Sequence, residues 1–386
     1  MNTDAYAVIL AGGRGERFWP MSTRRRPKQL LALVGRRALL ADAVYRIRAI
    51  IPEKRILVIT SVDLQDAVRH LLPGLPKANV IGEPCGRDTA AAITLAAALI
   101  KARNPHAVFC VLTADHVIGD AAVFRRTLKE AFARAAAADV LVTIGLKPAF
   151  PSTGFGYIEA GVPARNASHP PASPVAKPLR AGSDAGGRLA GPSRTAFYHV
   201  RRFVEKPNAR MAERYVKTGR FYWNSGMFVW SLSAWERALR RHCPPLARLL
   251  DMLAPLAGRA GFHAELKRAY AGLEKISVDY AVMEHADNIV MAEGVFPWDD
   301  VGSWSALEQH FPKDGHGNVV VGNGELMESS GNIVVADNGL VALVGVDNMV
   351  VVKAGAVTLV CRKDRSQEVK RMVEKLRRRR NAHPWL

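Results

Sequence analysis

Apolar and polar positions alternate in blocks through the first 145 residues of the chain. Short apolar runs, which predict strands, are separated by longer stretches with helical spacing, as in βαβ units. The predicted strands are Tyr6–Leu10, Arg55–Thr60, Val108–Thr113 and Val140–Gly145. The predicted helices are Ala38–Ile51, Asp63–Leu72, Ala90–Arg103 and Phe124–Ala138. We therefore expect an α/β fold with a mostly parallel, doubly wound sheet. Ligands of such sheets bind at the carboxyl ends of the strands, here the loops after Leu10, Thr60, Ile81 and Thr113.

The pattern is lost between residues 163 and 196, which are rich in Pro, Ala, Gly and Ser and hold few large apolar side chains. Such a segment cannot bury enough surface to order itself, so we predict a disordered surface insertion. A mixed region of strands and helices then continues to about residue 311, and Phe203, Phe228 and Trp230 are its expected core aromatics.

Five short apolar runs separated by Gly, Asn and Asp turns follow from Gly317: NVVVG, NIVVA, LVALVG, MVVVKAG and VTLVC. They predict a small sandwich, barrel or β-helix-like layer. A final amphipathic helix carries a stripe of Val369, Met372, Val373 and Leu376. This stripe packs either on its own domain or on a partner chain, which leaves a homodimer through this region open. We predict two domains, 1–311 and 317–386.

The charge of the chain points to an anionic partner. Its 386 residues contain 54 Lys and Arg against 35 Asp and Glu, a formal net charge of +19, which fits nucleotides, sugar phosphates, nucleic acid or a membrane surface. The four cysteines form no CxxC pair, and we expect no signal peptide or membrane span. A reduced, cytoplasmic location is the expectation.

A glycine-rich turn, Gly12-Gly13-Arg14-Gly15, follows the first predicted strand. Glycines let the backbone approach a ligand, and the N–H groups of such a turn form an anion-binding concavity. The turn matches neither the Walker A nor the GxGxxG pattern, and alone it is as often structural as functional. Arg17 and Lys28 nearby strengthen the phosphate-binding interpretation.

The stretch GEPCGRDTAAAITL begins at Gly82, after another short strand. Asp88 and Thr89 are predicted to cap a buried helix that starts near Ala90. A structural cap explains neither Glu83 nor Arg87. A carboxylate can accept hydrogen bonds from the N1–H and N2–H₂ edge of guanine, while a donor meets O6.

Two further groups of polar residues are candidates for chemistry. Asp115 follows the predicted strand Val108–Thr113 and, with Asp299 or Asp300, would supply the hard oxygen ligands of Mg²⁺. The spacing alone does not establish this pairing, and His116 is interpreted as structural. Later motifs supply side chains that could bind sugar hydroxyls or a second phosphate, although each alone is more typical of a surface or a cap: Glu205, Lys206, Asn224 and Asp279.

Together these stretches resemble one family, the mannose-1-phosphate guanylyltransferases, which make GDP-mannose. The matching pieces occur in family order: residues 10–20 (LAGGRGERFWP), 26–29 (RPKQ), 83–93 (EPCGRDTAAAI), 114–118 (ADHVI), 154–158 (GFGYI), 203–207 (FVEKP), 224–228 (NSGMF), 277–281 (SVDYA) and 300–304 (DVGSW). The first piece is common to most sugar nucleotidyltransferases, whereas the GRDTAAAI, NSGMF and DVGSW pieces are narrower.

The resemblance implies a Rossmann-like nucleotide-diphospho-sugar transferase domain over 1–311 and a small C-terminal β-rich, β-helix-like domain that ends in a helix. It implies GTP and mannose 1-phosphate as substrates and Mg²⁺ as cofactor, held by Asp115 and Asp300, with Arg17 and Lys28 also catalytic. The implied nucleotide-binding residues are Gly12, Gly13, Arg14, Gly15, Glu83, Gly86, Arg87, Asp88 and Thr89. The implied sugar-phosphate residues are Gly156, Glu205, Lys206, Asn224 and Asp279.

Other interpretations compete with this one. An enzyme for another sugar 1-phosphate, such as a heptose, or for another nucleotide would share the first motif. A catalytically silent, nucleotide-sensing relative would be expected to lack the aspartates or Lys28. Nucleic-acid binding is not expected because no recognised module is present. The 163–196 insertion replaces a usually short link, and the isomerase domain of longer relatives is not expected.

Overall fold

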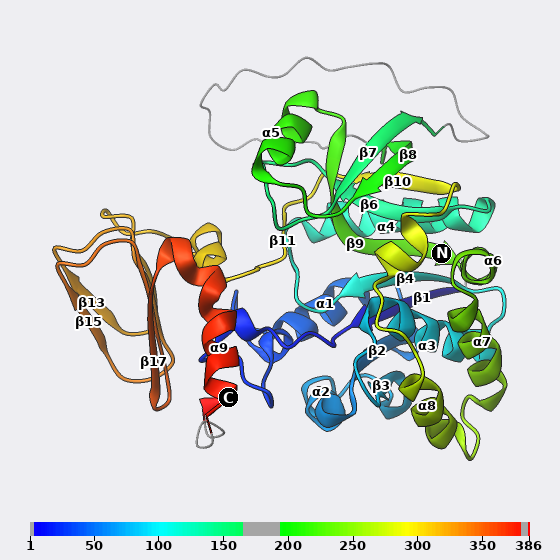
Figure 1. The fold of residues 1–386 in the computed structure, drawn as a ribbon, viewed down its shortest axis with the longest axis horizontal. Helices are drawn as coiled ribbons and strands as arrows, with labels where there is room; N and C mark the ends of the chain where they lie inside the picture. Colours follow the sequence, from blue (N-terminus) through cyan, green and yellow to red (C-terminus); the bar gives the residue numbers. More distant parts are fainter. Residues whose placement is uncertain (1–3, 165–193, 380–384) are drawn as a thin grey trace.

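The computed structural model of the chain describes residues 4–164, 194–379 and 385–386. Within these ranges a nine-stranded mixed sheet forms the centre of the larger part of the molecule (Figure 1). Its strands, in spatial order, are β3 (Val80–Glu83), β2 (Ile56–Ser61), β1 (Ala5–Leu10), β4 (Val108–Thr113), β9 (Phe221–Ser231), β6 (Leu141–Leu146), β10 (Ile289–Gly294), β8 (Phe197–Val204) and β7 (Tyr157–Pro163). The first four are parallel, and β9 runs antiparallel between β4 and β6. The predicted α/β fold is confirmed.

Helices cover both faces of this sheet, which explains why its central strands are apolar throughout. Successive side chains of a strand point to opposite faces. In β1, Tyr6 and Val8 therefore enter one core and Ala7 and Ile9 the other. The first core is covered by α3 (Asp88–Arg103), α6 (Leu232–His242), α7 (Pro244–Leu253) and α8 (Phe262–Ala271), and the second by α1 (Leu39–Ile47), α2 (Gln65–Leu71) and α4 (Ala121–Ala137).

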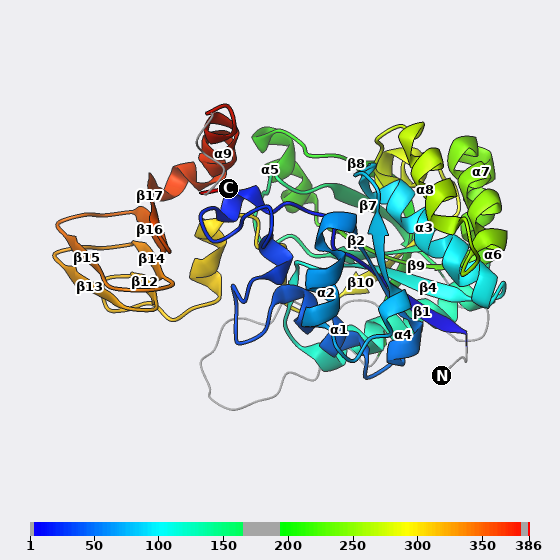
Figure 2. The ribbon, with the colours of Figure 1, turned by 90° about the horizontal axis from the view of Figure 1, so that it is seen from below.

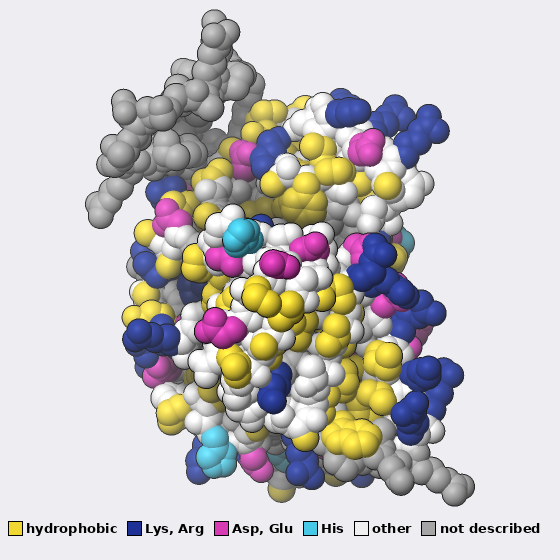
Figure 3. All heavy atoms as spheres, turned by 90° about the vertical axis from the view of Figure 1, so that its left-hand side faces the viewer, with side chains coloured by type: hydrophobic (Ala, Val, Ile, Leu, Met, Phe, Trp, Pro, Cys, Tyr) yellow, Lys and Arg dark blue, Asp and Glu magenta, His cyan; other side chains and the backbone are white. Residues whose placement is uncertain are grey.

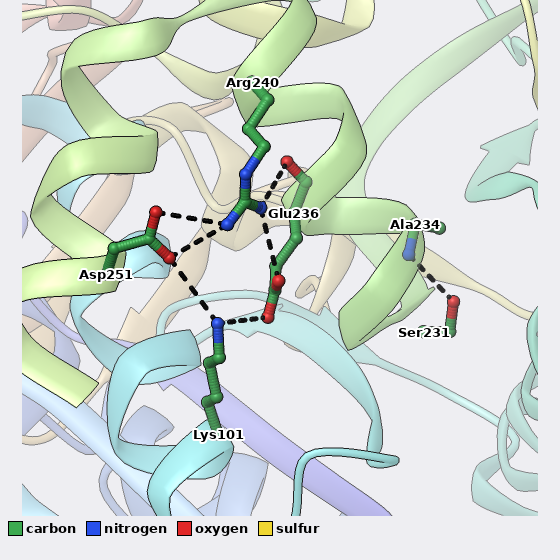
Figure 4. A network of polar contacts seen from close by, with 6 residues as sticks. All are labelled: Lys101, Ser231, Ala234, Glu236, Arg240 and Asp251. Carbon is green, nitrogen blue, oxygen red and sulfur yellow. Dashed lines mark hydrogen bonds and ion pairs between the residues drawn. The ribbon is translucent and has the colours of Figure 1, made fainter. Parts of the chain in front are cut away.

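Helix α3 is buried from Ala90 to Ile100 because α7 lies across it. An ion-pair network fastens the outer side of this layer (Figure 4): Lys101 contacts Glu236 at 3.0 Å and Asp251 at 3.5 Å, and Arg240 reaches the same two carboxylates. The network joins α3, α6 and α7. None of the helices in the described ranges has the length and apolar character that a bilayer crossing requires.

The C-terminal part forms two small sheets that stand beside the main body (Figures 1 and 2). One contains β12 (Val319–Val321), β14 (Ile333–Ala336), β16 (Met349–Ala354) and β17 (Val357–Arg362), and the other β13 (Gly324–Met327) and β15 (Val341–Val344). Successive rungs pair in parallel, β12 with β14 with β16 and β13 with β15. Of the three predicted architectures, the β-helix-like one is therefore confirmed.

Helix α9 (Val369–Arg377) ends this part and packs on its own chain. Val369 and Val373 of the predicted stripe are buried in a core that contains Phe18 and Trp19 of the first motif. Figures 1 and 2 accordingly show α9 beside the N-terminal loop. Met372 stays exposed. The stripe therefore has a partner within its own chain.

Several shorter elements complete the described chain. The two-residue strands β5 (Val117–Ile118) and β11 (Trp298–Asp299) pair with each other, and α5 (Ala209–Thr218) packs beside β7 and β9. The 3-10 helices are Glu16–Phe18, Lys28–Leu30, Glu53–Arg55, Val62–Leu64, Lys77–Asn79, Ala254–Leu256, Trp304–Gln309 and Lys363–Glu368, and a π-helical turn spans Asp279–Met283. The predicted insertion, 163–196, lies almost entirely outside the described residues.

Candidate active site

The glycine-rich loop begins where β1 ends, and its carbonyl groups are turned into the protein. The buried side chain of Gln29 donates to the carbonyls of Ala11 at 2.8 Å and Gly13 at 2.9 Å, and the Thr60 hydroxyl donates to Ala11 as well. Among the described residues, no partner accepts from the backbone N–H groups of residues 12–15. Because these groups are free and lie at the surface, the loop can cradle an anion.

Gly15 is the position where this loop comes closest to the rest of the site. Its φ of +60° lies in the left-handed region, and a Cβ there would stand 2.2 Å from the Cβ of Lys28. Only glycine fits both conditions. A Cβ at Gly13, by contrast, would meet nothing within 4 Å.

Lys28 lies beneath the loop and joins two segments that are far apart in sequence. The side chain is buried, and Nζ donates to Asp115 Oδ2 at 2.9 Å and to the Asp300 carbonyl oxygen at 2.5 Å. The pairing of β5 with β11 brings these segments together, because Ile118 stands opposite Trp298 and Val117 opposite Asp299.

The electrostatics of the two aspartates differ. Burial disfavours the ionised form of Asp115, but the charge and hydrogen bond of Lys28, together with His116 and a backbone hydrogen bond, outweigh burial and hold the pKa of that carboxyl below its ordinary value. Burial raises the pKa of Asp300 to about 6. The positive charges of Lys28 and Arg17 oppose this rise, whereas the negative charges of Asp299 and Asp115 add to it. The Asp300 carboxylate has no hydrogen-bond partner among the described residues, so it remains available to a cation.

Asp299, the aspartate next to Asp300, already has hydrogen-bond partners for both of its carboxylate oxygens. One of its oxygens accepts from the Val301 N–H at 2.7 Å, and the other contacts His310 Nε2 at 2.7 Å. His116 is neutral, because burial lowers its pKa to about 4, and its Nδ1 accepts from the indole of Trp298 at 3.1 Å. Both residues therefore hold the loops rather than face a ligand, which agrees with the structural interpretation of His116.

These side chains fit a hard divalent cation. The described residues contain no group of three or more potential His, Cys, Asp or Glu ligands. Mg²⁺ is usually held by one or two carboxylates, with water and phosphate oxygens completing the shell. Asp115 and Asp300 supply that number, and a cation would also relieve the unfavourable burial of the Asp300 charge.

The predicted base loop lies beside the glycine-rich loop. Glu83 is buried at the end of β3, accepts from the Tyr270 hydroxyl at 3.2 Å, and stands within 3.8 Å of where a Gly12 Cβ would be. Burial raises the pKa of Glu83 to about 7, although the Tyr270 hydrogen bond opposes the rise. Gly86 would meet nothing within 4 Å if it carried a Cβ, so the loop is open there.

The predicted cap of the following helix is wrong in detail. Helix α3 begins at Asp88, two residues earlier than expected, and its N-cap is Arg87 without a side-chain cap bond. Asp88 accepts from the adjacent Thr89 N–H, and Thr89 Oγ1 accepts from the Val278 N–H at 2.9 Å. The reason is tertiary: Arg87 donates to the carbonyls of Tyr270 and Ala271 at 2.8 Å each, which ties the loop to α8.

All five predicted sugar-phosphate residues meet in one cluster. Asn224 on β9 donates to Asp279 at 2.8 Å, and its backbone N–H donates to the Gly156 carbonyl at 2.9 Å. A Cβ on Gly156 would stand 2.9 Å from Glu205 Oε2, and Lys206 Nζ contacts Glu205 at 2.6 Å. Burial, reinforced by the Glu205 charge, raises the pKa of Asp279 to about 6. The cluster offers carboxylates, an amide and one ammonium to a polar ligand.

Aromatic contacts connect this cluster with the aspartates. Trp298 packs edge-on against His116 at 5.1 Å and against Phe155 at 5.2 Å between ring centroids. Phe155 precedes Gly156, and His116 follows Asp115. The base loop is attached to the same cluster through Thr89 and Val278. The three groups of predicted residues therefore line one edge of the sheet.

The sequence interpretation missed several residues that shape this edge. Gln29 stands inside the quoted RPKQ motif, so a signal was present. Tyr270 is 187 residues from Glu83 along the chain, and nothing in its local sequence marks it. A mixed sheet whose parallel strands end at a glycine-rich loop, two carboxylates and a buried lysine defines an enzyme that handles nucleotide phosphates.

Two family descriptions match the chain. Nucleotidyl transferase matches residues 6–316, and MannoseP isomerase/GMP-like beta-helix domain matches residues 317–376. The chain thus has the fold and the class of a nucleotidyltransferase.

Named relatives narrow the class. Mannose-1-phosphate guanylyltransferase of Escherichia coli is 35% identical over 96% of this chain and 73% of its own length. Xanthan biosynthesis protein XanB of Xanthomonas campestris pv. campestris is 35% identical over 97% of this chain and 74% of its own. A crystal structure described as mannose-1-phosphate geranyltransferase from Thermus thermophilus aligns with a TM-score of 0.81 and 34% identity, over 97% of this chain and 100% of that one. The chain belongs to the mannose-1-phosphate guanylyltransferase family and is an enzyme of the nucleotidyltransferase class.

Proposed function

We propose that this chain transfers GMP from GTP to α-D-mannose 1-phosphate, giving GDP-mannose and pyrophosphate. One observation carries the proposal: Lys28 contacts both Asp115 and Asp300. These three residues lie between the buried carboxylate of Glu83, beside the glycine-rich loop, and the five-residue polar cluster around Asn224. One reacting phosphate would lie on each side of this centre. The family name of the relatives agrees with the substrates.

The chemistry proposed is an in-line displacement. A phosphate oxygen of mannose 1-phosphate attacks the α-phosphorus of GTP, and the electron pair of the breaking bond goes to the bridging oxygen of the departing pyrophosphate. Because a phosphate monoester is already a competent nucleophile at neutral pH, no general base is needed. Catalysis then rests on positioning and on neutralisation of charge.

Different residues bind the triphosphate, stabilise the developing charge and bind the sugar phosphate. The free N–H groups of residues 12–15, with Arg14 and Arg17, hold the triphosphate, and Lys28 stabilises charge on the α-phosphoryl group and on the leaving pyrophosphate. Glu83 accepts from the guanine edge. Lys206 meets the second phosphate, and Glu205, Asn224 and Asp279 orient the sugar. Asp115 and Asp300 would hold Mg²⁺, which when bound supplies charge neutralisation for the reacting phosphates.

The test is a substrate matrix in which each nucleoside triphosphate is offered with each sugar 1-phosphate while pyrophosphate release is followed. We expect GTP with mannose 1-phosphate to be preferred, and chelation of divalent cations to abolish the reaction. Preference for ATP or dTTP would overturn the guanine assignment. Preference for a heptose 1-phosphate would make the chain a sister enzyme, and GTP binding without turnover would support a sensor.

The high pKa of Glu83 leads to a prediction about pH. To accept from N1–H and N2–H₂ of guanine together, both oxygens of Glu83 must be free of a proton, so below pH 7 GTP binding must also remove a proton from Glu83. We expect the KM for GTP to fall as pH rises from 5.5 to 8, by about tenfold per unit on the acid side. Glu83→Gln is the control, because phosphate groups and Asp300 titrate in both proteins. A ratio of the two KM values that does not change with pH would exclude this role.

The same group affects stability with a defined sign. Because the folded-state pKa of Glu83, about 7, exceeds its ordinary value of 4.5, protonation favours the fold. This contribution is fully present below pH 4.5 and is lost as pH rises through 7. Glu83→Gln is expected to remove that slope from the free energy of unfolding.

Cellular location and oligomeric state stay predictions. For the predicted homodimer, the β13–β15 sheet is a better candidate interface than α9. Met327 and Val344 stand opposite each other on its outer face and are 58% and 61% exposed. Figure 3 shows hydrophobic side chains gathered across the face that this part of the chain turns outward.

A further inference from the structure

Trp304 joins the loop that carries the cations of the site to the loop that carries Asp300. Its side chain is fully buried, and its indole N–H donates to the backbone carbonyl of Trp19 at 3.1 Å. Its ring packs on Phe18 with centroids 5.0 Å apart. Phe18 follows Arg17 directly, and its ring lies 5.7 Å from Lys28 Nζ. One side chain thus connects the two halves of the phosphate site.

The Asp300 loop needs support from outside itself. Val301, a β-branched residue, has a φ of +46°, a region that costs backbone energy unless the surroundings hold it. The N–H of Val301 is held by Asp299, and the side chain is fully buried. Gly302 brings the backbone so close that a Cβ there would stand 3.2 Å from Asp300 Oδ2. The position of the Asp300 carboxylate therefore depends on the segment that follows it.

The C-terminal β-rich part completes this support. Trp304 shares one hydrophobic core with Phe18 and with side chains of that part, among them Val319, Ile333 and Val350. The buried Ser366 hydroxyl donates to Ser305 at 3.1 Å, on the turn that begins at Trp304. Arg377 of α9 contacts Glu16 at 2.6 Å from the other side. Both loops are thus braced against the same body.

We propose that Trp304 is a positioning residue of the phosphate site, which sets the distance from Arg17 and Lys28 to the Asp300 carboxylate through its bond to Trp19. This inference rests on the proposed function for its kinetic meaning. Among the described residues the hydrogen bond and ring contact of Trp304 go to Trp19 and Phe18, so we expect its loss to affect the cation and triphosphate side and to leave the sugar side intact. Displacement of preorganised groups by a fraction of an ångström lowers turnover strongly.

The test compares two substitutions of buried tryptophans. Trp304→Phe keeps an aromatic ring and removes the indole N–H. Trp235→Phe is the matched control, because Trp235 is also fully buried, lies on α6 stacked on Trp230, and has an indole N–H without a partner among the described residues. We expect both to lower the melting temperature. Only Trp304→Phe is expected to lower kcat, by about tenfold to a hundredfold, and to raise the Mg²⁺ concentration for half-maximal rate, with an unchanged KM for mannose 1-phosphate.

An equal kcat in the two variants would overturn the proposal, as would a loss confined to the KM for mannose 1-phosphate. If Trp304→Phe does not fold, Phe18→Leu weakens the same packing contact between Phe18 and Trp304. It is expected to give the same result, a lower kcat with an unchanged KM for mannose 1-phosphate.

A second readout needs no turnover. In the free protein, amide hydrogen exchange of Phe18, Trp19 and Ser22, whose N–H groups donate to carbonyls within this loop, is expected to be about tenfold faster in Trp304→Phe than in Trp235→Phe. A wild-type chain that releases no pyrophosphate from GTP and mannose 1-phosphate would refute the proposed function. Exchange would still decide whether Trp304 braces the loop, and unchanged exchange would refute that role.

Discussion

Lys28→Ala is expected to reduce kcat by about 10² to 10³-fold, the usual effect of removing one preorganised charge contact. The ammonium contacts both acidic segments, at Asp115 Oδ2 and the Asp300 carbonyl. Because it lowers the pKa of both aspartates, its loss also raises both pKa values and shifts the acid limb of the rate profile to higher pH. Steady-state pyrophosphate release measured from pH 5 to 9 checks both effects.

Lys101→Ala provides a matched control for that result. Lys101 also contacts two carboxylates, those of Glu236 and Asp251, but on the outer helix layer (Figure 4). We expect its turnover to stay within about twofold of the wild type, because these half-buried ion pairs join α3, α6 and α7 and contact none of the proposed site residues. Full activity in Lys28→Ala would exclude this lysine from catalysis.

Gly15→Ala is the second substitution with a large expected effect. The new methyl group would collide with Lys28, whose Cβ lies 2.2 Å from the Cβ position, and φ is +60°. We expect a loss of roughly 2–5 kcal/mol of unfolding free energy from overpacking and backbone strain together. Displacement of Lys28 is expected to lower kcat by about a hundredfold. Denaturant unfolding and steady-state kinetics measure the two effects.

Gly219→Ala is the control that introduces backbone strain without a steric collision. Gly219 has a φ of +67°, and a Cβ there would meet nothing within 4 Å. It terminates α5, away from the glycine-rich loop. We expect a stability loss of about 1 kcal/mol from the left-handed backbone and unchanged turnover. If Gly15→Ala behaved in the same way, the close approach to Lys28 would have no part in catalysis.

The sequence predicted the parts of the fold that have strong local patterns. The apolar runs of β1 and β4 and the helical spacing of α3 and α4 appear within a few residues of their expected bounds. Strand β13 was missed because GELM holds only two large apolar residues, and its inner face is defined by its pairing with β15. The 11-residue β9 was predicted only as part of a mixed region, since its register depends on three neighbouring strands.

For the site, motifs indicated residues but not their mutual contacts. The approach of Asp115 and Asp300 depends on the pairing of two strands of two residues each, β5 and β11, which is too short to leave a pattern. The attachment of Arg87 to the carbonyls of α8 likewise arises from tertiary packing. Local chemistry suggested a cap at Asp88 or Thr89, and tertiary contacts determined what those residues do.

The shared core of Phe18, Trp19 and Trp304 with the C-terminal strands has a consequence for how the enzyme matures on the ribosome. Glu16 and Arg377 are 361 residues apart in sequence, and the loop between β1 and Lys28 is held by side chains synthesised near the other end of the described chain. The first four strands of the large sheet can pair while translation continues, because β1, β2, β3 and β4 are all in the first 113 residues. The contacts that α9 makes with the phosphate loop are completed only after α9 has emerged. A nascent chain therefore carries its nucleotide motif for most of its synthesis without a finished nucleotide site.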